Sequence, residues 1–221
     1  RGFLAGVPNL MTAYGYQLRT ITEPVVEPIS LEEAKQQCQI DEDITERNAD
    51  LELYIAAARE LAENYTERSF CERAFRLSLD RFPTGDNWPA DYKICLPRGP
   101  VIEVLSIRYT EQTGAEVTLE EDTDYTVAID DEPPYIVPAY TEFWPIPRFH
   151  PGSVRIEYRA GYASSGSPAG ADNVPPAVKQ ALRFLVAHWN ENREAVTLAG
   201  GAPQDVPLGF YDALQKFRSY P

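Results

Sequence analysis

The chain has 221 residues, with 20 Lys and Arg against 34 Asp and Glu, and its formal net charge at pH 7 is -14. Hydrophobic residues make up 43% of it, which is enough for a real core and excludes the disordered class. The negative charge argues against DNA binding as the main task, because affinity for a duplex comes mainly from Lys and Arg. We therefore expect one globular domain, or one domain with a large insertion, whose contacts with DNA are weak.

The sequence also predicts a soluble protein that is not exported and does not enter a membrane. No apolar run approaches the roughly 18 to 20 residues that cross a bilayer. Pro8 and Asn9 interrupt the first ten residues, where a signal peptide would be apolar. The three cysteines form no CxxC pair, which is typical of reduced thiols rather than of a disulfide framework.

Residues 1–28 are predicted to form an extended N-terminal arm. Polar and apolar residues alternate from Ala13 onward, and Pro24 and Pro28 prevent a continuous helix. A proline-bearing arm ahead of a compact core can reach across to a neighbouring copy and become ordered only on assembly. The candidate inter-subunit residues of this arm are Leu18, Ile21, Val25 and Val26.

Residues 29–72 are predicted to contain two helices joined by an acidic link. Ser30 and Glu33 form a capping box that starts the first helix, which is expected to end near Ile40. The second helix is expected at about residues 49–69, where apolar residues recur at spacings of three and four. The segment holds 12 acidic residues against 4 basic ones, so more than half of the net charge lies here.

Residues 73–162 change to a period of two and are predicted to form a mostly antiparallel β-domain inserted between helical parts. The proline-rich segment 133–151 is expected to stay out of any central strand, because proline cannot donate a hydrogen bond to a neighbouring strand. The predicted strands are residues 75–79, 92–96, 101–109, 125–129 and 153–158.

Residues 163–196 are predicted to comprise a flexible loop and a long core helix, which begins after Pro175 and Pro176 and ends near Glu194. Residues 197–221 follow as a linker rich in Gly, Ala and Pro and a short segment of helically spaced apolar residues. The predicted fold class is therefore α+β, with an N-terminal helix pair and C-terminal helices around a mostly antiparallel all-β insertion.

No motif for catalysis or for binding a metal or cofactor is found. Only His150 and His188 are available for a triad or a histidine metal site, and His188 lies among charges as a helix-surface histidine does. Two acidic turns, residues 120–124 and 130–132, could bind a metal ion or serve a hydrolase, but acids also gather at solvated turns. The sequence therefore predicts no catalytic residue, no metal and no cofactor.

Two further functions fit parts of the sequence. Aromatic residues gather in the proline-rich segment and could form the stacking platform of a carbohydrate-binding β-module, although aromatics that pack on prolines also form local cores. The charge of residues 32–72 suits an acidic inhibitor that mimics DNA, although acids on an amphipathic helix are more simply its solvent-facing side. The aromatic candidates are Tyr135, Tyr140, Phe143 and Trp144.

Four short motifs occur in an order that resembles a known family. Residues 27–35 (EPISLEEAK) precede the first helix, and residues 96–101 (LPRGPV) precede a strand. Residues 158–162 (YRAGY) end the last strand, and residues 174–181 (VPPAVKQA) open the late helix. Together, over about residues 18–194, they resemble the head-tail connector, or adaptor, proteins of tailed bacteriophages and gene transfer agents.

This resemblance implies a structural virion protein of the head–tail interface, not an enzyme, that is present in the bacterial host cytoplasm during assembly. It implies a helical connector core that builds a ring, typically of twelve copies, around an axial channel through which DNA passes without tight binding. The implied partners are other copies of the chain, the portal protein, and a tail-side completion or tail-terminator protein. In this family the C-terminal segment tends to reach toward the portal, although the same residues could cover their own core. The candidate portal-docking residues are Phe210, Tyr211, Leu214, Phe217 and Tyr220.

Overall fold

A computed structural model of the chain describes residues 16–87, 90–162, 173–192 and 208–219. Its helices and antiparallel sheets form an α+β fold, as the sequence predicts. No helix in these ranges is long and apolar enough to cross a membrane.

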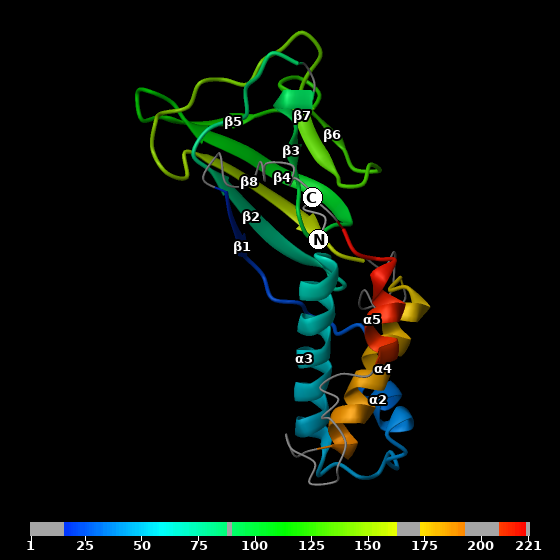
Figure 1. The fold of residues 1–221 in the computed structure, drawn as a ribbon. Coiled ribbons are helices and arrows are strands. Elements are labelled where there is room, and N and C mark those ends of the chain that lie inside the picture. Colours follow the sequence, from blue (N-terminus) through cyan, green and yellow to red (C-terminus); the bar gives the residue numbers. More distant parts are fainter. Residues whose placement is uncertain (1–15, 88–89, 163–172, 193–207, 220–221) are drawn as a thin grey trace, which may run out of the picture. The chain divides into compact units, whose positions relative to one another are not determined.

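The described chain divides into two compact units, each with its own apolar core (Figure 1). The β-unit consists of residues 16–23 and 73–160, and the helical unit consists of residues 24–72 and 161–219. The chain therefore leaves the helical unit once to build most of the β-unit and then returns.

The helical unit begins with two helices whose starts differ. Helix α2 (Leu31–Gln37) has the predicted capping box: the Ser30 hydroxyl accepts from the amide of Glu33, and the Glu33 carboxylate accepts from the amide of Ser30. Helix α3 (Asn48–Thr66) has no side-chain cap at its start and ends at Glu67, whose φ of 56° is left-handed. Helix α3 buries Leu51, Ile55, Ala58 and Ala62 of the apolar stripe predicted from its spacing, and the other members of the stripe are partly buried.

Two C-terminal helices complete this unit, α4 (Pro176–Glu191) and α5 (Leu208–Gln215). Pro176 stands at the first turn of α4, where the missing amide hydrogen leaves no hydrogen bond unmade. Helix α4 packs against α3, and α5 packs against α4 (Figure 1). Apolar side chains of all four helices share one core; its fully buried members include Leu51, Ala58, Ala62, Phe70, Val178, Leu182, Leu185 and Phe210.

Gly161 explains the YRAGY motif at the point where the chain re-enters the helical unit. Its φ is +124°, and a Cβ placed there would lie 2.2 Å from the carbonyl oxygen of Cys71. Any other residue would clash with this backbone as well as adopt an unfavourable conformation. Tyr162 follows and stacks on Phe70, with ring centroids 6.0 Å apart.

The β-unit contains a five-stranded sheet in the order β1-β2-β8-β4-β5 and a three-stranded sheet in the order β3-β7-β6. Neighbouring strands in both sheets are antiparallel. The strand bounds are β1 Gln17–Thr20, β2 Arg73–Leu79, β3 Ile94–Cys95, β4 Val101–Thr110, β5 Glu116–Leu119, β6 Tyr125–Ala128, β7 Tyr135–Pro138 and β8 Val154–Ala160, with a short 3-10 helix η1 at Ala90–Tyr92.

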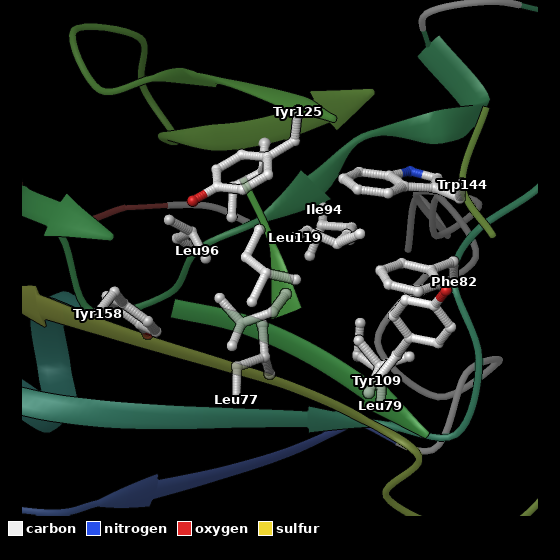
Figure 2. Close-up of a cluster of buried hydrophobic side chains, with 14 of the residues drawn as sticks. Leu77, Leu79, Phe82, Ile94, Leu96, Tyr109, Leu119, Tyr125, Trp144 and Tyr158 are labelled. Carbon is white, nitrogen blue, oxygen red and sulfur yellow. The ribbon is translucent and has the colours of Figure 1, made fainter. Parts of the chain in front are cut away.

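One apolar core joins the two sheets of the β-unit. Alternate residues of β2 and β8 face it, as their burial pattern shows, and residues of β3, β6 and β7 face it from the smaller sheet. Figure 2 shows this core, in which Trp144 lies on Phe82 at one end and Tyr158 lies at the other. The hydroxyl of Tyr158 donates to the carbonyl of Pro97, so the one polar atom of this fully buried side chain is satisfied.

The expectation that residues 133–151 avoid a central strand is wrong for the start of that segment. Strand β7 is the middle strand of the smaller sheet, between β3 and β6. Pro133 and Pro134 precede the strand and Pro138 is its last residue, so the residues between them keep the amide groups that a middle strand needs.

Residues 1–15 of the predicted arm lie outside the described residues, and residues 16–23, which follow them, belong to the β-unit. Strand β1 pairs with β2, and Leu18 lies opposite Leu77 and packs against the core. Strand β5, the partner of β4 across the Gln112–Gly114 turn, was not predicted. The predicted flexible loop lies largely outside the described residues.

Candidate assembly surfaces

The structure gives the candidate catalytic groups ordinary surroundings. Within the described ranges, no group of three or more His, Cys, Asp or Glu side chains could hold a metal ion. His150 Nδ1 lies 2.9 Å from the carbonyl oxygen of Pro151, and His188 of α4 contacts Asn192, the residue after the end of that helix. Burial is the main cause that raises the pKa of the Cys38 and Cys95 thiols, which makes each a poorer nucleophile. The third cysteine, Cys71, is a buried free thiol.

The first acidic turn has a structural role. The Asp124 carboxylate accepts from the amide of Glu120 at 2.8 Å and so closes the turn before β6. Burial, with the nearby carboxylates, raises the pKa of Tyr125 to about 12. The acids of residues 130–132 are exposed. These turns therefore show carboxylates that cap or surround a hairpin rather than converge on a cleft.

Trp144 is a core residue of the β-unit. Its ring stacks on Phe82 with centroids 4.8 Å apart and an interplanar angle of 7°, and 5% of the residue is exposed (Figure 2). Its indole nitrogen donates to the carbonyl of Tyr92 at 2.8 Å. A sugar-stacking platform needs an exposed ring face. The tryptophan on which the carbohydrate-binding alternative depended is thus used in packing.

The predicted portal-docking residues on α5 and after it differ in burial. Phe210 and Leu214 are fully buried in the core of the helical unit, and Phe217 packs partly against it. Tyr211 is 36% exposed, and its ring lies 4.8 Å from that of Tyr65. Tyr220 lies outside the described residues. The structure therefore leaves Tyr211 as the large exposed side chain among the described candidates.

Two hydrogen bonds hold the end of the described chain on α3. Arg68 Nε donates to the carbonyl of Phe217 at 2.5 Å, and the amide of Ser219 donates to the carbonyl of Thr66 at 2.9 Å. The second bond satisfies a carbonyl at the C-terminal end of α3, which has no partner inside the helix. Helix α5 is consequently anchored at its apolar face and just beyond its end.

The arm candidates are placed differently from one another. Leu18 is partly buried in the β-unit, as described above. Ile21 is 44% exposed and Val25 is 96% exposed, whereas Val26 is half-buried. An almost fully exposed valine next to a proline gains nothing from its own chain, so it is available to a neighbouring molecule.

A buried charge network that no sequence pattern indicated fixes the residues that follow the arm. Arg59 of α3 donates to the Glu27 carboxylate at 2.8 Å and to the Glu63 carboxylate at 3.3 Å. Glu63 also accepts from the amide of Phe70 at 2.8 Å. Burial alone would lower the pKa of Arg59, but the hydrogen bond and the two carboxylates raise it. The network ties the segment before α2 to the end of α3.

Exposed apolar side chains gather in the loop between β7 and β8. Tyr140 is 84% exposed, Phe143 68%, Ile146 82% and Phe149 92%. Large apolar side chains at this exposure on one segment mark a surface that meets another molecule. The sequence showed only that the segment was rich in aromatics and prolines; which rings are buried depends on Trp144 filling the core.

The outward face of the five-stranded sheet carries arginines, a feature that sequence reasoning also missed. We call this set the arginine face. Its side chains point away from the core because they alternate with buried residues of their strands. The alternation was visible within each strand, but the pairing of distant strands was not. The arginine face consists of Arg19, Arg76, Arg108, Arg155 and Arg159.

These features define the class of protein: a two-unit α+β chain whose distinctive residues lie on surfaces rather than around a reaction centre. The family model described as phage gp6-like head-tail connector protein matches residues 28–135. Over these residues the chain is similar to the head-tail connector family, which confirms the resemblance seen in the motifs. No curated protein matches the chain.

Solved structures with the same fold come from gene transfer agent (GTA) particles. One, described as the neck of an empty GTA particle computed with C6 symmetry, is 22% identical with a TM-score of 0.72. Another, from the virion of a native GTA particle, is 22% identical with a TM-score of 0.71. A third, from the neck of a native particle computed with C12 symmetry, is 24% identical with a TM-score of 0.67. Each match covers 93% of this chain and 96% of the other.

Proposed function

We propose that the chain is a structural head-tail connector that forms a ring of twelve copies between portal and tail, around a channel for DNA. The observation that carries this proposal is the connector family match over residues 28–135. The fold shared with particle necks computed with C6 and C12 symmetry supports it, because a ring of twelve obeys both symmetries. The role requires no catalysis, and it places the chain in the virion, after assembly in the cytoplasm of the bacterial host.

The charge of the chain suits a channel through which DNA must slide. Twelve copies, at -14 each, would carry -168 formal charges. A negative lumen repels phosphates and so prevents the tight contacts that would hold DNA in place. The same charge opposes assembly, because the copies repel one another until salt screens them beyond roughly 8 to 10 Å.

We assign the exposed residues of α5 and of the arm to partners. Tyr211 stands on a helix that is anchored to its own core, so it can present a rigid aromatic side chain to the portal. Ile21 and Val25 lie on the exposed part of the arm and are assigned to a neighbouring copy. The tail-side protein binds elsewhere on the ring.

A salt series tests whether self-repulsion controls assembly. We expect the ring fraction, measured by light scattering, to rise as salt increases from low to moderate concentration. A ring fraction that falls steadily over this range would contradict the electrostatic part of the proposal. Chains that never form rings and never bind portal particles at any salt concentration would contradict the connector role itself.

A further inference from the structure

Two pairs of arginines lie directly opposite each other on neighbouring strands of the β-unit. Arg19 of β1 is paired with Arg76 of β2, and Arg108 of β4 is paired with Arg155 of β8. All four residues are exposed on the arginine face. Like charges directly opposite each other destabilise a sheet. Two such pairs on one face do not stabilise the isolated chain, so they indicate that the face binds another molecule.

Carboxylates on the same face neutralise only part of this charge. Arg76 pairs with Glu157 at 2.7 Å, and Arg155 pairs with Glu116 at 3.4 Å. Arg159 pairs with Glu103 at 2.7 Å. The five arginines and three glutamates leave this face with two positive charges in excess, on a chain whose net charge is -14.

Arg19 and Arg108 account for the excess. Among the residues that the structure describes, neither side chain has a hydrogen bond or an ion pair. Each is fully charged at neutral pH, because arginine does not deprotonate in proteins. Each therefore presents a planar guanidinium whose donors are available to a carboxylate of another molecule.

The helical unit carries a surface of the opposite sign, the acidic link, which we define as residues 41–46 between α2 and α3. Its four acidic residues are exposed and have no ion pair within the described chain. The buried Lys35 holds the link in shape, because its ammonium group donates to the carbonyls of Glu42 and Ile44 at 2.9 and 2.8 Å. The backbone is thus fixed while the carboxylates of Asp41, Glu42, Asp43 and Glu46 stay in solvent.

We propose that the arginine face of one copy binds the acidic link of the next copy in the ring. This inference rests on the proposed connector function. Charge complementarity supports it: the helical unit has 9 basic and 18 acidic residues, a net charge of -9, whereas the arginine face has a positive excess. The two surfaces differ, so the contact is heterologous, which is the kind of contact that closes a ring.

DNA is a less suitable occupant of the arginine face. Glu103, Glu116 and Glu157 lie among the arginines and would face the phosphates. A protein surface can match a face of mixed sign, whereas the phosphate backbone is uniformly negative.

Charge reversal of the two unpaired arginines separates assembly from stability. The double variant Arg19→Glu, Arg108→Glu places a glutamate opposite Arg76 and another opposite Arg155, so the isolated chain should melt at or above the wild-type Tm. Its association into rings should weaken by about tenfold or more. The neutral variant Arg19→Gln, Arg108→Gln should weaken association less. The control Lys179→Glu has the same charge change per site, in the first turn of α4 and outside both proposed surfaces, and should assemble nearly normally.

Mixing two assembly-deficient variants tests the acidic link as the occupant. The variant Asp41→Lys, Glu42→Lys, Asp43→Lys changes the charge of the link from -4 to +2 and should also fail to form rings alone. When it is mixed with the arginine-face variant, alternating copies restore an opposite-charge contact at every interface of an even-numbered ring. Light scattering and negative-stain images of each variant and of the mixture provide the readout, with and without portal particles.

The proposal is supported if each variant fails alone and the mixture recovers rings. Normal rings from the arginine-face variant would overturn it, as would failure of the mixture to recover. Binding of a DNA duplex that is lost in the arginine-face variant, with assembly unchanged, would assign the face to nucleic acid instead. If wild-type chains form no ring and bind no portal, both the connector function and this contact are contradicted. If the wild type forms rings and the variants form them equally well, only the contact is contradicted.

Discussion

Alanine substitutions at adjacent residues of α5 separate the core role of this helix from its proposed docking role. Phe210 is fully buried, so Phe210→Ala removes a large side chain from the core of the helical unit and leaves a cavity. Such substitutions cost about 3–5 kcal/mol. Tyr211 is 36% exposed and packs on Tyr65 through one side of its ring. Tyr211→Ala should therefore cost only about 1 kcal/mol, mostly the partial burial and the ring contact.

Urea unfolding followed by circular dichroism at 222 nm measures both effects. With a slope of roughly 2 kcal/mol per molar urea, Phe210→Ala should lower the midpoint of the helical transition by about 2 M and Tyr211→Ala by about 0.5 M. Tyr211→Ala should stay folded and yet bind poorly to portal particles, as measured by cosedimentation. Wild-type stability of Phe210→Ala would refute the core assignment, and undiminished portal binding by folded Tyr211→Ala would refute the docking assignment.

Three further substitutions test the buried groups. Arg59→Met should destabilise the helical unit by about 3–5 kcal/mol in urea unfolding, because it removes the cation that pairs with the buried Glu63 carboxylate. Glu63→Gln keeps an acceptor for the Phe70 amide and should destabilise the unit less. Equal losses of stability would contradict this assignment. Trp144→Ala should lower the stability of the β-unit by about 3–5 kcal/mol. Neither the wild type nor this variant should bind sugars on a glycan array, and wild-type binding that the variant loses would support the carbohydrate alternative. The pKa of Tyr125 is raised to about 12, so its neutral form is stabilised in the folded state; that stability is present below pH 10 and is lost as pH rises from 10 toward 12. Tyr125→Phe should therefore lose less stability than the wild type over this range, by about 1–3 kcal/mol, and parallel pH profiles would contradict the raised pKa.

Local patterns in the sequence predicted the helical elements well, because the deciding interactions lie within a few residues. The capping box needs only Ser30 and Glu33, and the structure contains both of its hydrogen bonds. The stripe of α3 and the proline start of α4 follow from spacing and from a missing amide. The ordered motifs also carried the family resemblance, partly because a residue such as Gly161 is required by backbone geometry.

Features that depend on distant residues could not be predicted in this way. The Arg59–Glu27 bond joins residues 32 positions apart, and nothing local distinguishes either partner from a surface charge. The arginine pairs depend on the register of β1 with β2 and of β4 with β8. Strand β7 was excluded because prolines were counted over the whole segment, although they fall at its ends. Whether Phe210 was core or surface depended on which face of α5 meets α4.

The exposed apolar loop and the arginine face both indicate contact with another molecule. Both retain side chains that a single copy does not stabilise, four large apolar residues in one case and opposed like charges in the other. A chain that works alone gains nothing from either. Their presence in one unit is the reason to interpret this protein through its interfaces.

Light scattering of the purified chain, alone and mixed with portal particles, tests the connector role most directly, with negative-stain images of any large species. The role predicts rings with a mass of twelve times 24.8 kDa, about 298 kDa, or a defined complex on the portal. A monodisperse 24.8 kDa monomer that remains a monomer with portal particles at every salt concentration would contradict it.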